Sequence, residues 1–338
     1  MKPLLALLLL ATTAIPSAAR AEPLPGLDRL TLDAPHRPKV IEALVWYPAA
    51  NGTYPTPLGA NPVFLGTTVQ VGPIPAPGAH PVLILSHGSG GNIESLGWLA
   101  EGLVARGAIV AGLNHPRSTS GDSNPRDMPN VSDRVADLAA LIDGLTTHPT
   151  FAPLVDPARI VALGFSLGGG TVLAAAGARL DADAYAAYCD AHTPAATDCS
   201  FMQRGGVDWH ALPPAWESDM RLPAITGAIA VDPGFSHAMT DASLSAIAIP
   251  VHLINLGDAP IQVNVGPDGS NLAARIPDAR YSLIDPAWHF SFLGLCKPDA
   301  PALLAEVGED PICDDPAGSD RAAVHARIID QVATAMGL

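Results

Sequence analysis

Hydrophobic residues along the chain fall into short continuous runs that alternate with longer segments of helical spacing. A short apolar run bounded by turn residues is typical of a strand buried on both faces of a parallel sheet. Such runs cover 40–47, 82–86, 108–113, 159–163, 224–231, 249–256 and 280–284. Helical composition marks 93–106, 132–145, the stretch from 164 to 179, and 321–336. This alternation predicts an α/β fold with a mostly parallel central sheet flanked by helices, and Ser132 is the expected N-cap of the second helix.

Two segments depart from this rhythm. Residues 49–80 carry many prolines and glycines with little periodicity, which predicts a long surface excursion. Residues 180–223 contain Tyr185, Tyr188, Trp209, Trp216, two cysteines and several prolines. We interpret this second segment as a cap or lid insertion over the carboxyl edge of the sheet, favoured by its aromatic residues. The alternative is a surface insertion with no role at the functional site.

The N-terminus has the pattern of an export signal. Lys2 precedes an apolar stretch at 4–15, which is too short to span a bilayer, and Ala19 and Ala21 supply the small residues that a signal peptidase recognises. This pattern predicts a signal peptide at 1–21 with cleavage after Ala21, and a single domain at 22–338. We therefore expect a periplasmic or secreted protein without a transmembrane segment in the mature chain.

The cysteines and the charge limit the chemistry further. An exported chain with four cysteines favours disulfides, and pairing of neighbours, Cys189 with Cys199 and Cys296 with Cys313, is the simplest of three connectivities. The cysteine and histidine spacing does not favour zinc, so no metal is expected. The chain has 18 Lys and Arg against 33 Asp and Glu, a formal charge of −15, which makes nucleic acid an unsuitable partner.

The pentapeptide Gly164-Phe165-Ser166-Leu167-Gly168 is the main chemical signal. It has the form G-x-S-x-G, with an apolar run before it and a helix-forming run after it. This context predicts a nucleophile elbow, in which a sharp strand-to-helix turn lifts the serine hydroxyl above the sheet. The positive end of the helix would favour an anionic tetrahedral intermediate. The alternative is a glycine-rich turn in which Ser166 only caps the helix.

The segment Ser86-His87-Gly88-Ser89-Gly90-Gly91 follows a buried strand and would place backbone N–H groups opposite the nucleophile. Acyl transfer needs such donors where negative charge develops, and we predict the N–H groups of Ser89 and Leu167 for this oxyanion hole. His87 precedes the nucleophile, so we expect it to shape the loop rather than to act as the base. The sequence lacks the pattern of a phosphate-binding loop here.

The base should follow the nucleophile and the acid along the chain. His289 lies just after the last expected strand and is the best-placed candidate, whereas His325 is expected on the surface of the terminal helix. Two acids stand at strand ends, Asp232 after 224–231 and Asp258 after 249–256. Either could orient the histidine and stabilise its imidazolium.

Taken in order, several segments resemble the α/β-hydrolase superfamily. They are VLILSHGSGG (82–91), AIVAGLNHPRS (108–118), ARIVALGFSLGGGTV (158–172), GAIAVDPGF (227–235), IPVHLINLGD (249–258) and AWHFSFLGLC (287–296). The branch they resemble holds the platelet-activating-factor acetylhydrolases and bacterial proteins labelled predicted dienelactone hydrolases. The acetylhydrolases place the acid after the earlier strand, which implies Asp232. The resemblance also implies Ser166 as nucleophile, His289 as base, and Ser89 and Leu167 as oxyanion donors. True dienelactone hydrolases have a cysteine at the position of Ser166, so their substrate is not implied.

These observations predict an exported serine hydrolase that cleaves small carboxylic esters or lipid-like esters through an acyl-enzyme, with no cofactor. The alternatives are a phospholipid acetylhydrolase, a lipase or polyester hydrolase, and a non-catalytic binding protein on a hydrolase fold. The 180–223 insertion has no counterpart that we recognise in the acetylhydrolases, and a long cap argues against a polymer as substrate.

Overall fold

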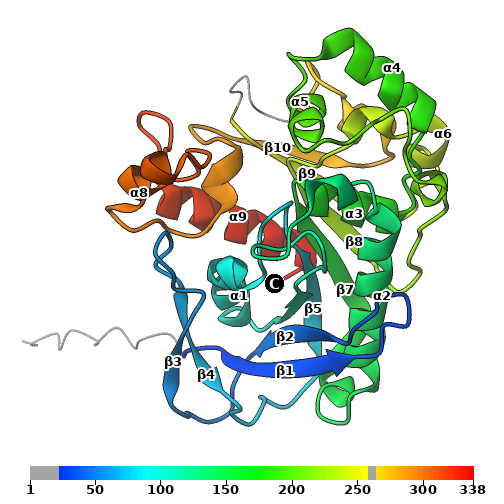
Figure 1. The fold of residues 1–338 in the computed structure, drawn as a ribbon. Coiled ribbons are helices and arrows are strands. Elements are labelled where there is room, and N and C mark those ends of the chain that lie inside the picture. Colours follow the sequence, from blue (N-terminus) through cyan, green and yellow to red (C-terminus); the bar gives the residue numbers. More distant parts are fainter. Residues whose placement is uncertain (1–22, 258–263) are drawn as a thin grey trace, which may run out of the picture.

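The computed structural model describes residues 23–257 and 264–338, drawn in Figure 1. The predicted signal peptide at 1–21 and the candidate acid Asp258 lie outside the described residues. Within the described part of the chain, no helix is both long and apolar enough to cross a bilayer.

The centre of the molecule is a ten-stranded sheet with the strand order β10-β9-β8-β7-β5-β6-β2-β1-β4-β3. The six strands from β5 to β10 run parallel to one another, whereas β2 is antiparallel to both β6 and β1. Their bounds are β1 Gly26–Leu32, β2 Ile41–Tyr47, β3 Pro55–Leu58, β4 Thr67–Val71, β5 His80–Ser86, β6 Ile109–Leu113, β7 Val155–Phe165, β8 Gly227–Val231, β9 Val251–Leu256 and β10 Arg280–Ile284. The sheet is therefore mostly parallel, as the sequence predicts.

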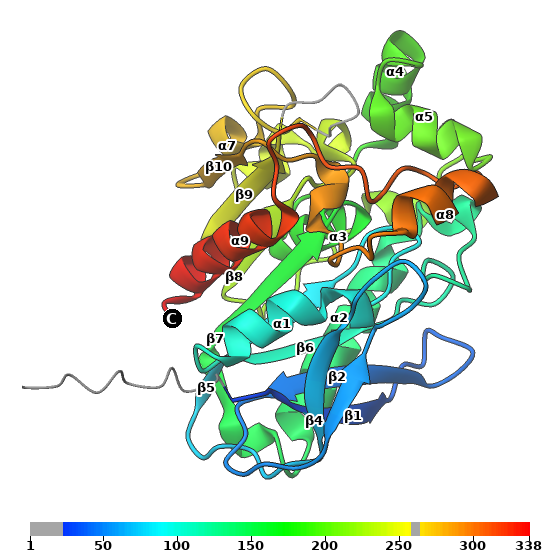
Figure 2. The same ribbon diagram turned by 90° about the vertical axis from the view of Figure 1, so that its left-hand side faces the viewer.

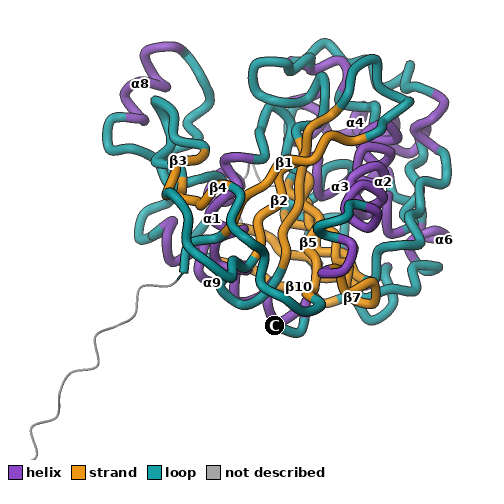
Figure 3. The backbone as a smooth tube through the Cα atoms, turned by 90° about the horizontal axis from the view of Figure 1, so that it is seen from below, coloured by secondary structure: helices purple, strands orange, loops and turns teal. Residues whose placement is uncertain are grey.

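Helices cover the sheet on both faces, as Figures 2 and 3 show, with α1 and α9 on one side and α2 and α3 on the other. Each face has its own apolar core, because the central strands are buried on both sides. The helix bounds are α1 Gly97–Val104, α2 Val131–Thr147, α3 Leu167–Ala176, α4 Ala182–His192, α5 Thr197–Arg204, α6 Asp241–Leu244, α7 Leu272–Arg275, α8 Ala300–Val307 and α9 Arg321–Met336.

Two local expectations were wrong, and one strand was not predicted. The segment 49–80 is not only a surface excursion, because β3 and β4 extend the sheet there, and β1 precedes them in a stretch with no strand prediction. These strands carry prolines or exposed polar residues because they lie toward one edge of the sheet. The second helix begins at Val131, so that Asn130, two residues before the expected Ser132, occupies the N-cap position.

The segment 180–223 contains α4, α5 and a short 3₁₀ helix at Pro214–Glu217. Tyr185 of α4 and Trp216 of the 3₁₀ helix are buried, and both rings pack against Phe235 at 5.6 and 4.6 Å between centroids. Phe235 stands four residues after the end of β8. The segment therefore lies against the loop that follows the carboxyl end of this strand.

Both predicted disulfides are present in the structure. Cys189 of α4 is bonded to Cys199 of α5. Cys296, which precedes α8 in the sequence, is bonded to Cys313, which follows it. The first bond joins the two helices of the 180–223 segment. The second closes the loop that leads from the last strand toward α9.

Candidate active site

Ser166 stands at a sharp turn between β7 and α3. Its φ of 55° and ψ of −119° put a non-glycine residue in a sparsely populated backbone region, which is costly unless the surroundings enforce it. The backbone is tied at this point, because Ser166 N–H donates to Val231 O and Ser166 O accepts from the N–H groups of Gly170 and Gly234. The turn predicted from G-x-S-x-G is therefore present.

The two glycines of the motif are required by close packing. A Cβ on Gly164 would lie 1.9 Å from Gly168 O, and a Cβ on Gly168 would lie 2.0 Å from Ser86 O. No side chain fits at either position without moving the backbone. The short distances bring the end of β5 beside the first turn of α3, so the loop that begins at Ser86 lies next to Ser166.

Ser166, His289 and Asp232 form a chain of hydrogen-bonding contacts. Ser166 Oγ lies 3.1 Å from His289 Nε2, and His289 Nδ1 lies 3.0 Å from Asp232 Oδ2. The Asp232 side chain is fully buried and the His289 side chain is 13% exposed. A protonated Nδ1 that donates to Asp232 leaves Nε2 free to accept the hydroxyl proton of Ser166.

Asp232 follows β8 directly and has a left-handed φ of 43°. Its Oδ1 accepts from Asn255 Nδ2 at 2.7 Å and from the Leu256 N–H at 3.0 Å, both on β9. These donors hold the buried carboxyl group in place from β9, and its other oxygen, Oδ2, faces His289. The sequence analysis did not single out Asn255, because an amide inside a buried strand gives no signal until its neighbours are known.

His289 begins a short 3₁₀ helix at His289–Phe292, and its ring lies 4.5 Å from that of Phe165. This turn is held by His325, whose Nε2 lies 3.1 Å from Ser291 O and 2.9 Å from Leu293 O. The expectation that His325 lies on the helix surface was wrong. It is buried and stacked on Trp98, with ring centroids 3.7 Å apart, because this face of α9 packs on α1.

The predicted oxyanion donors lie beside the nucleophile. A Cβ on Gly88 would stand 3.3 Å from Ser166 Cβ, so the Gly88–Ser89 peptide is next to Ser166. Leu167 is the first residue of α3. Within the described residues, no hydrogen-bond acceptor pairs with the N–H of Ser89 or of Leu167.

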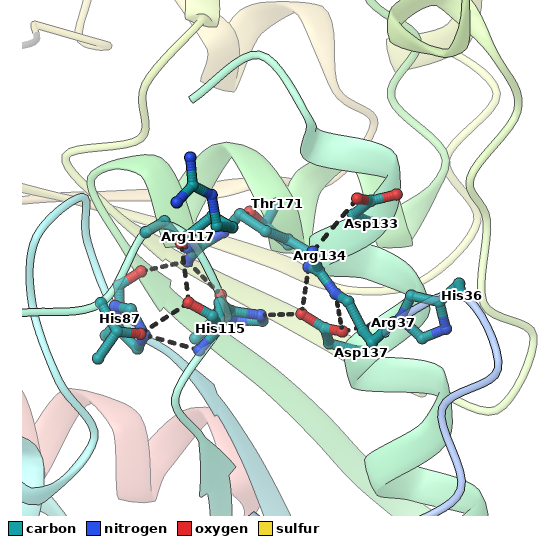
Figure 4. Close-up of polar contacts among 12 residues, drawn as sticks. His36, Arg37, His87, His115, Arg117, Asp133, Arg134, Asp137 and Thr171 are labelled. Carbon is teal, nitrogen blue, oxygen red and sulfur yellow. Dashed lines mark hydrogen bonds and ion pairs between the residues drawn. The ribbon is translucent and has the colours of Figure 1, made fainter. Parts of the chain in front are cut away.

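A buried polar cluster lies behind the 86–91 loop, as Figure 4 shows. The Arg134 guanidinium donates to Ser118 Oγ at 2.6 Å, to Ser86 Oγ and Thr171 Oγ1 at 3.1 Å, and to the carbonyl of His87. Burial lowers the pKa of Arg134 to about 9, so it stays charged at neutral pH. One cation thus joins β5, α3 and the loop between β6 and α2.

The negative partner in this cluster is Asp137. It accepts from His115 Nδ1 at 2.8 Å and from Arg37 at 2.7 and 2.9 Å. Although burial opposes it, these donors hold the pKa of Asp137 well below its usual range. Sequence analysis missed the cluster, although Arg134 and Asp137 stand three apart on the otherwise apolar face of a predicted helix.

A second serine–histidine–aspartate chain of contacts joins Ser86, His115 and Asp137. Ser86 Oγ lies 3.0 Å from His115 Nε2, and His115 Nδ1 contacts Asp137. This second arrangement cannot serve as a nucleophile site in the folded state. Ser86 is fully buried, and its oxygen already accepts from Arg134. Burial, with the nearby charge of Arg134, lowers the pKa of His115 to about 4, so its ring is neutral.

A cavity of about 360 Å³ opens between the 180–223 segment and the loop after β9. It is lined by Tyr188, His192, Asp198, His237, Asn264 and Asp268, among others. The rings of Tyr188 and His237 are stacked with centroids 4.0 Å apart. In the described part of the chain, no group of three His, Cys, Asp or Glu side chains could hold a metal ion.

Comparison with known proteins identifies the fold. No family model matches the chain, and no curated protein sequence matches it significantly. Among solved structures, a ferulic acid esterase from Streptomyces cinnamoneus is similar, with a TM-score of 0.59 and 19% identity over 96% of this chain and 92% of the other. A dienelactone hydrolase-like promiscuous phosphotriesterase, P91, from metagenomic libraries has a TM-score of 0.53 and 12% identity over 93% and 98%.

These structural similarities, together with the parallel sheet and the turn at Ser166, define the fold class of the protein. The chain has the α/β-hydrolase fold.

Proposed function

We propose that this protein is an exported serine hydrolase that cleaves carboxylic esters. Ser166 is the nucleophile, His289 the general base and acid, and Asp232 the residue that orients His289. The backbone N–H groups of Ser89 and Leu167 form the oxyanion hole. The substrate is a small or lipid-like ester, and the 180–223 segment is a cap that bounds its binding site.

The observation that carries the proposal is the contact chain Ser166–His289–Asp232 on a strained turn. A serine hydroxyl is a weak nucleophile until a neighbouring base takes its proton, and His289 Nε2 is 3.1 Å away. Strained backbone persists where the surrounding structure enforces it, and it concentrates at functional sites. The N–H groups of Ser89 and Leu167, which have no acceptor among the described residues, add the second requirement of acyl transfer, a place for negative charge.

The mechanism follows from these positions. Ser166 Oγ attacks the ester carbonyl carbon as its proton passes to His289 Nε2, and the carbonyl oxygen becomes an oxyanion facing Ser89 and Leu167. The C–O bond to the alcohol then breaks, and His289 returns the proton to the departing alkoxide. Water, deprotonated by His289, then attacks the acyl carbon; the bond from this carbon to Ser166 Oγ breaks, the acid leaves, and His289 returns the proton to Ser166 Oγ.

Export is supported by the two disulfides, since such bonds persist in oxidising compartments. The cap is supported by its packing on Phe235, three residues beyond Asp232, and by the cavity that residues of α4 and α5 help to line. The structural likeness to two proteins named as an esterase and a dienelactone hydrolase-like phosphotriesterase agrees with ester chemistry.

The test is labelling of the mature protein with a fluorophosphonate, mapped by peptide mass spectrometry, alongside hydrolysis of p-nitrophenyl acetate, butyrate and octanoate. We expect labelling at Ser166 and turnover of the shorter esters. Ser166→Ala should abolish both, whereas replacement of the exposed Ser245 by alanine should change neither. Unchanged hydrolysis by Ser166→Ala would overturn the assignment, and a folded wild type without label or turnover would favour a binding protein.

A further inference from the structure

The Gly88–Ser89 peptide is fixed from its carbonyl side. Gly88 O lies 2.7 Å from His87 Nδ1 and accepts from the Gly91 N–H at 3.1 Å. The carbonyl and the N–H of a trans peptide point in opposite directions. Whatever holds the Gly88 carbonyl therefore also sets the direction of the Ser89 N–H, which is one of the two proposed oxyanion donors.

The proton of the His87 ring is on Nδ1. The His115 N–H points at His87 Nε2, with 3.1 Å between the nitrogens, so Nε2 is the acceptor and carries the lone pair. Thr119 Oγ1 is a second neighbour of the same nitrogen at 3.1 Å. Burial, with the nearby charge of Arg134, keeps the pKa of His87 well below its ordinary value, so the ring is neutral. Nδ1–H is thus a donor to Gly88 O.

The ring has little freedom to move. His87 is 1% exposed, and both of its nitrogens are engaged. Its own carbonyl accepts from Arg134, which is anchored in turn by Ser118 and by Thr171 of α3. The donor that holds the Gly88 carbonyl is consequently fixed relative to the helix that carries Leu167, the other proposed oxyanion donor.

We propose that His87 is a positioning residue that aims the Ser89 N–H at the oxyanion. This role rests on the proposed function, because it concerns the oxyanion hole of the same reaction. His87 touches neither substrate nor nucleophile. It acts through a single peptide group, whose carbonyl it holds so that the N–H is already oriented when negative charge develops.

The consequence is kinetic. A donor aligned before reaction stabilises the transition state without further reorganisation, and removal of one such donor lowers kcat by about 10²-fold to 10³-fold in other hydrolases. An ester in the ground state carries little charge on its carbonyl oxygen, so KM should change little. Loss of His87 should therefore lower kcat while KM stays within about threefold.

The experiment compares His87→Asn, His87→Gln and His87→Leu. The asparagine amide can stand where Nδ1 stands and donate to Gly88 O, whereas the longer glutamine places its amide near the position of Nε2. We expect kcat for p-nitrophenyl acetate within about tenfold of wild type for asparagine, and losses of about 10²-fold for glutamine and leucine. The fluorophosphonate labelling rate should fall in the same order.

His252→Leu is the matched control. His252 is also a buried histidine of lowered pKa, but it lies in β9 and its ring contacts Ser282 of β10. Its loss should lower the unfolding temperature without the drop in kcat. Equal kcat for the asparagine and glutamine variants, or a drop in His252→Leu as large as in His87→Leu, would overturn the positioning role. A wild type that neither labels nor turns over would instead overturn the proposed function itself.

Discussion

Mild acid is expected to destabilise this fold through its buried histidines. Burial lowers the pKa of both His115 and His325 to about 4 in the folded protein, and the nearby Arg134 adds to the effect at His115. In the unfolded chain both rings titrate near pH 6.5. Between these two values the unfolded state binds more protons, so the free energy of unfolding falls as the pH is lowered.

The size of the effect follows from the two pKa values. Lowering the pH from 7 to 5 costs about 2 kcal/mol for each ring that stays neutral in the folded state and is protonated in the unfolded state. The two rings together therefore remove about 4 kcal/mol, which is a large part of the 5 to 15 kcal/mol that typically stabilises a domain. His87 adds to the loss, because its pKa is also lowered by burial.

The assay is urea unfolding of wild type and His325→Gln, followed by circular dichroism, at several pH values from 7 to 5. The glutamine amide can donate to the carbonyls of Ser291 and Leu293 that His325 Nε2 contacts, but it does not titrate. We expect the pH-dependent loss to be smaller in this variant by about 2 kcal/mol. The same pH-dependent loss of unfolding free energy in wild type and variant would refute the reasoning for His325. No loss in either protein would refute it for all the buried histidines named here.

Three further predictions concern the site and its supports. Asp232→Asn should lower kcat by about 10⁴-fold, as in other triads, with Asp258→Asn close to wild type, and the reverse ranking in p-nitrophenyl acetate assays would reassign the acid. Gly168→Ala should lose activity and melt at a lower temperature by circular dichroism, because its Cβ would stand 2.0 Å from Ser86 O; a wild-type melting curve would contradict this. Replacing Cys189 and Cys199 together by serine should cost about 2 to 4 kcal/mol in urea unfolding, and an unchanged midpoint would show that this bond stabilises nothing.

The central strands could be predicted because each is buried on both faces and is therefore apolar throughout. Strands β5, β6 and β8 illustrate this, since every residue from 82 to 86, 109 to 113 and 227 to 231 is buried. The outer strands could not, because their residues alternate between the core and solvent or include proline. β3, with Pro55, Thr56 and Pro57 all exposed, has no apolar pattern to detect.

The contact chain at Ser166 brings together three predicted residues that lie far apart in the sequence. Their order and their positions at strand ends are visible in the sequence, because the carboxyl ends of parallel strands meet at one edge. Asn255, His325 and the cluster around Arg134 are different. Their roles depend on tertiary contacts in the interior, and a single sequence does not show which residues are in contact.

The proline spacing in β3 has a consequence beyond the fold. Pro55 and Pro57 alternate along the outermost strand, and a proline nitrogen cannot donate a hydrogen bond. The ladder with β4 must therefore use the N–H groups of Thr56 and Leu58, which leaves the prolines facing outward. A strand from another molecule would meet carbonyls there without matching donors. The long sheet is thus closed to growth at this end, which prevents molecules of this protein from associating edge to edge through β3.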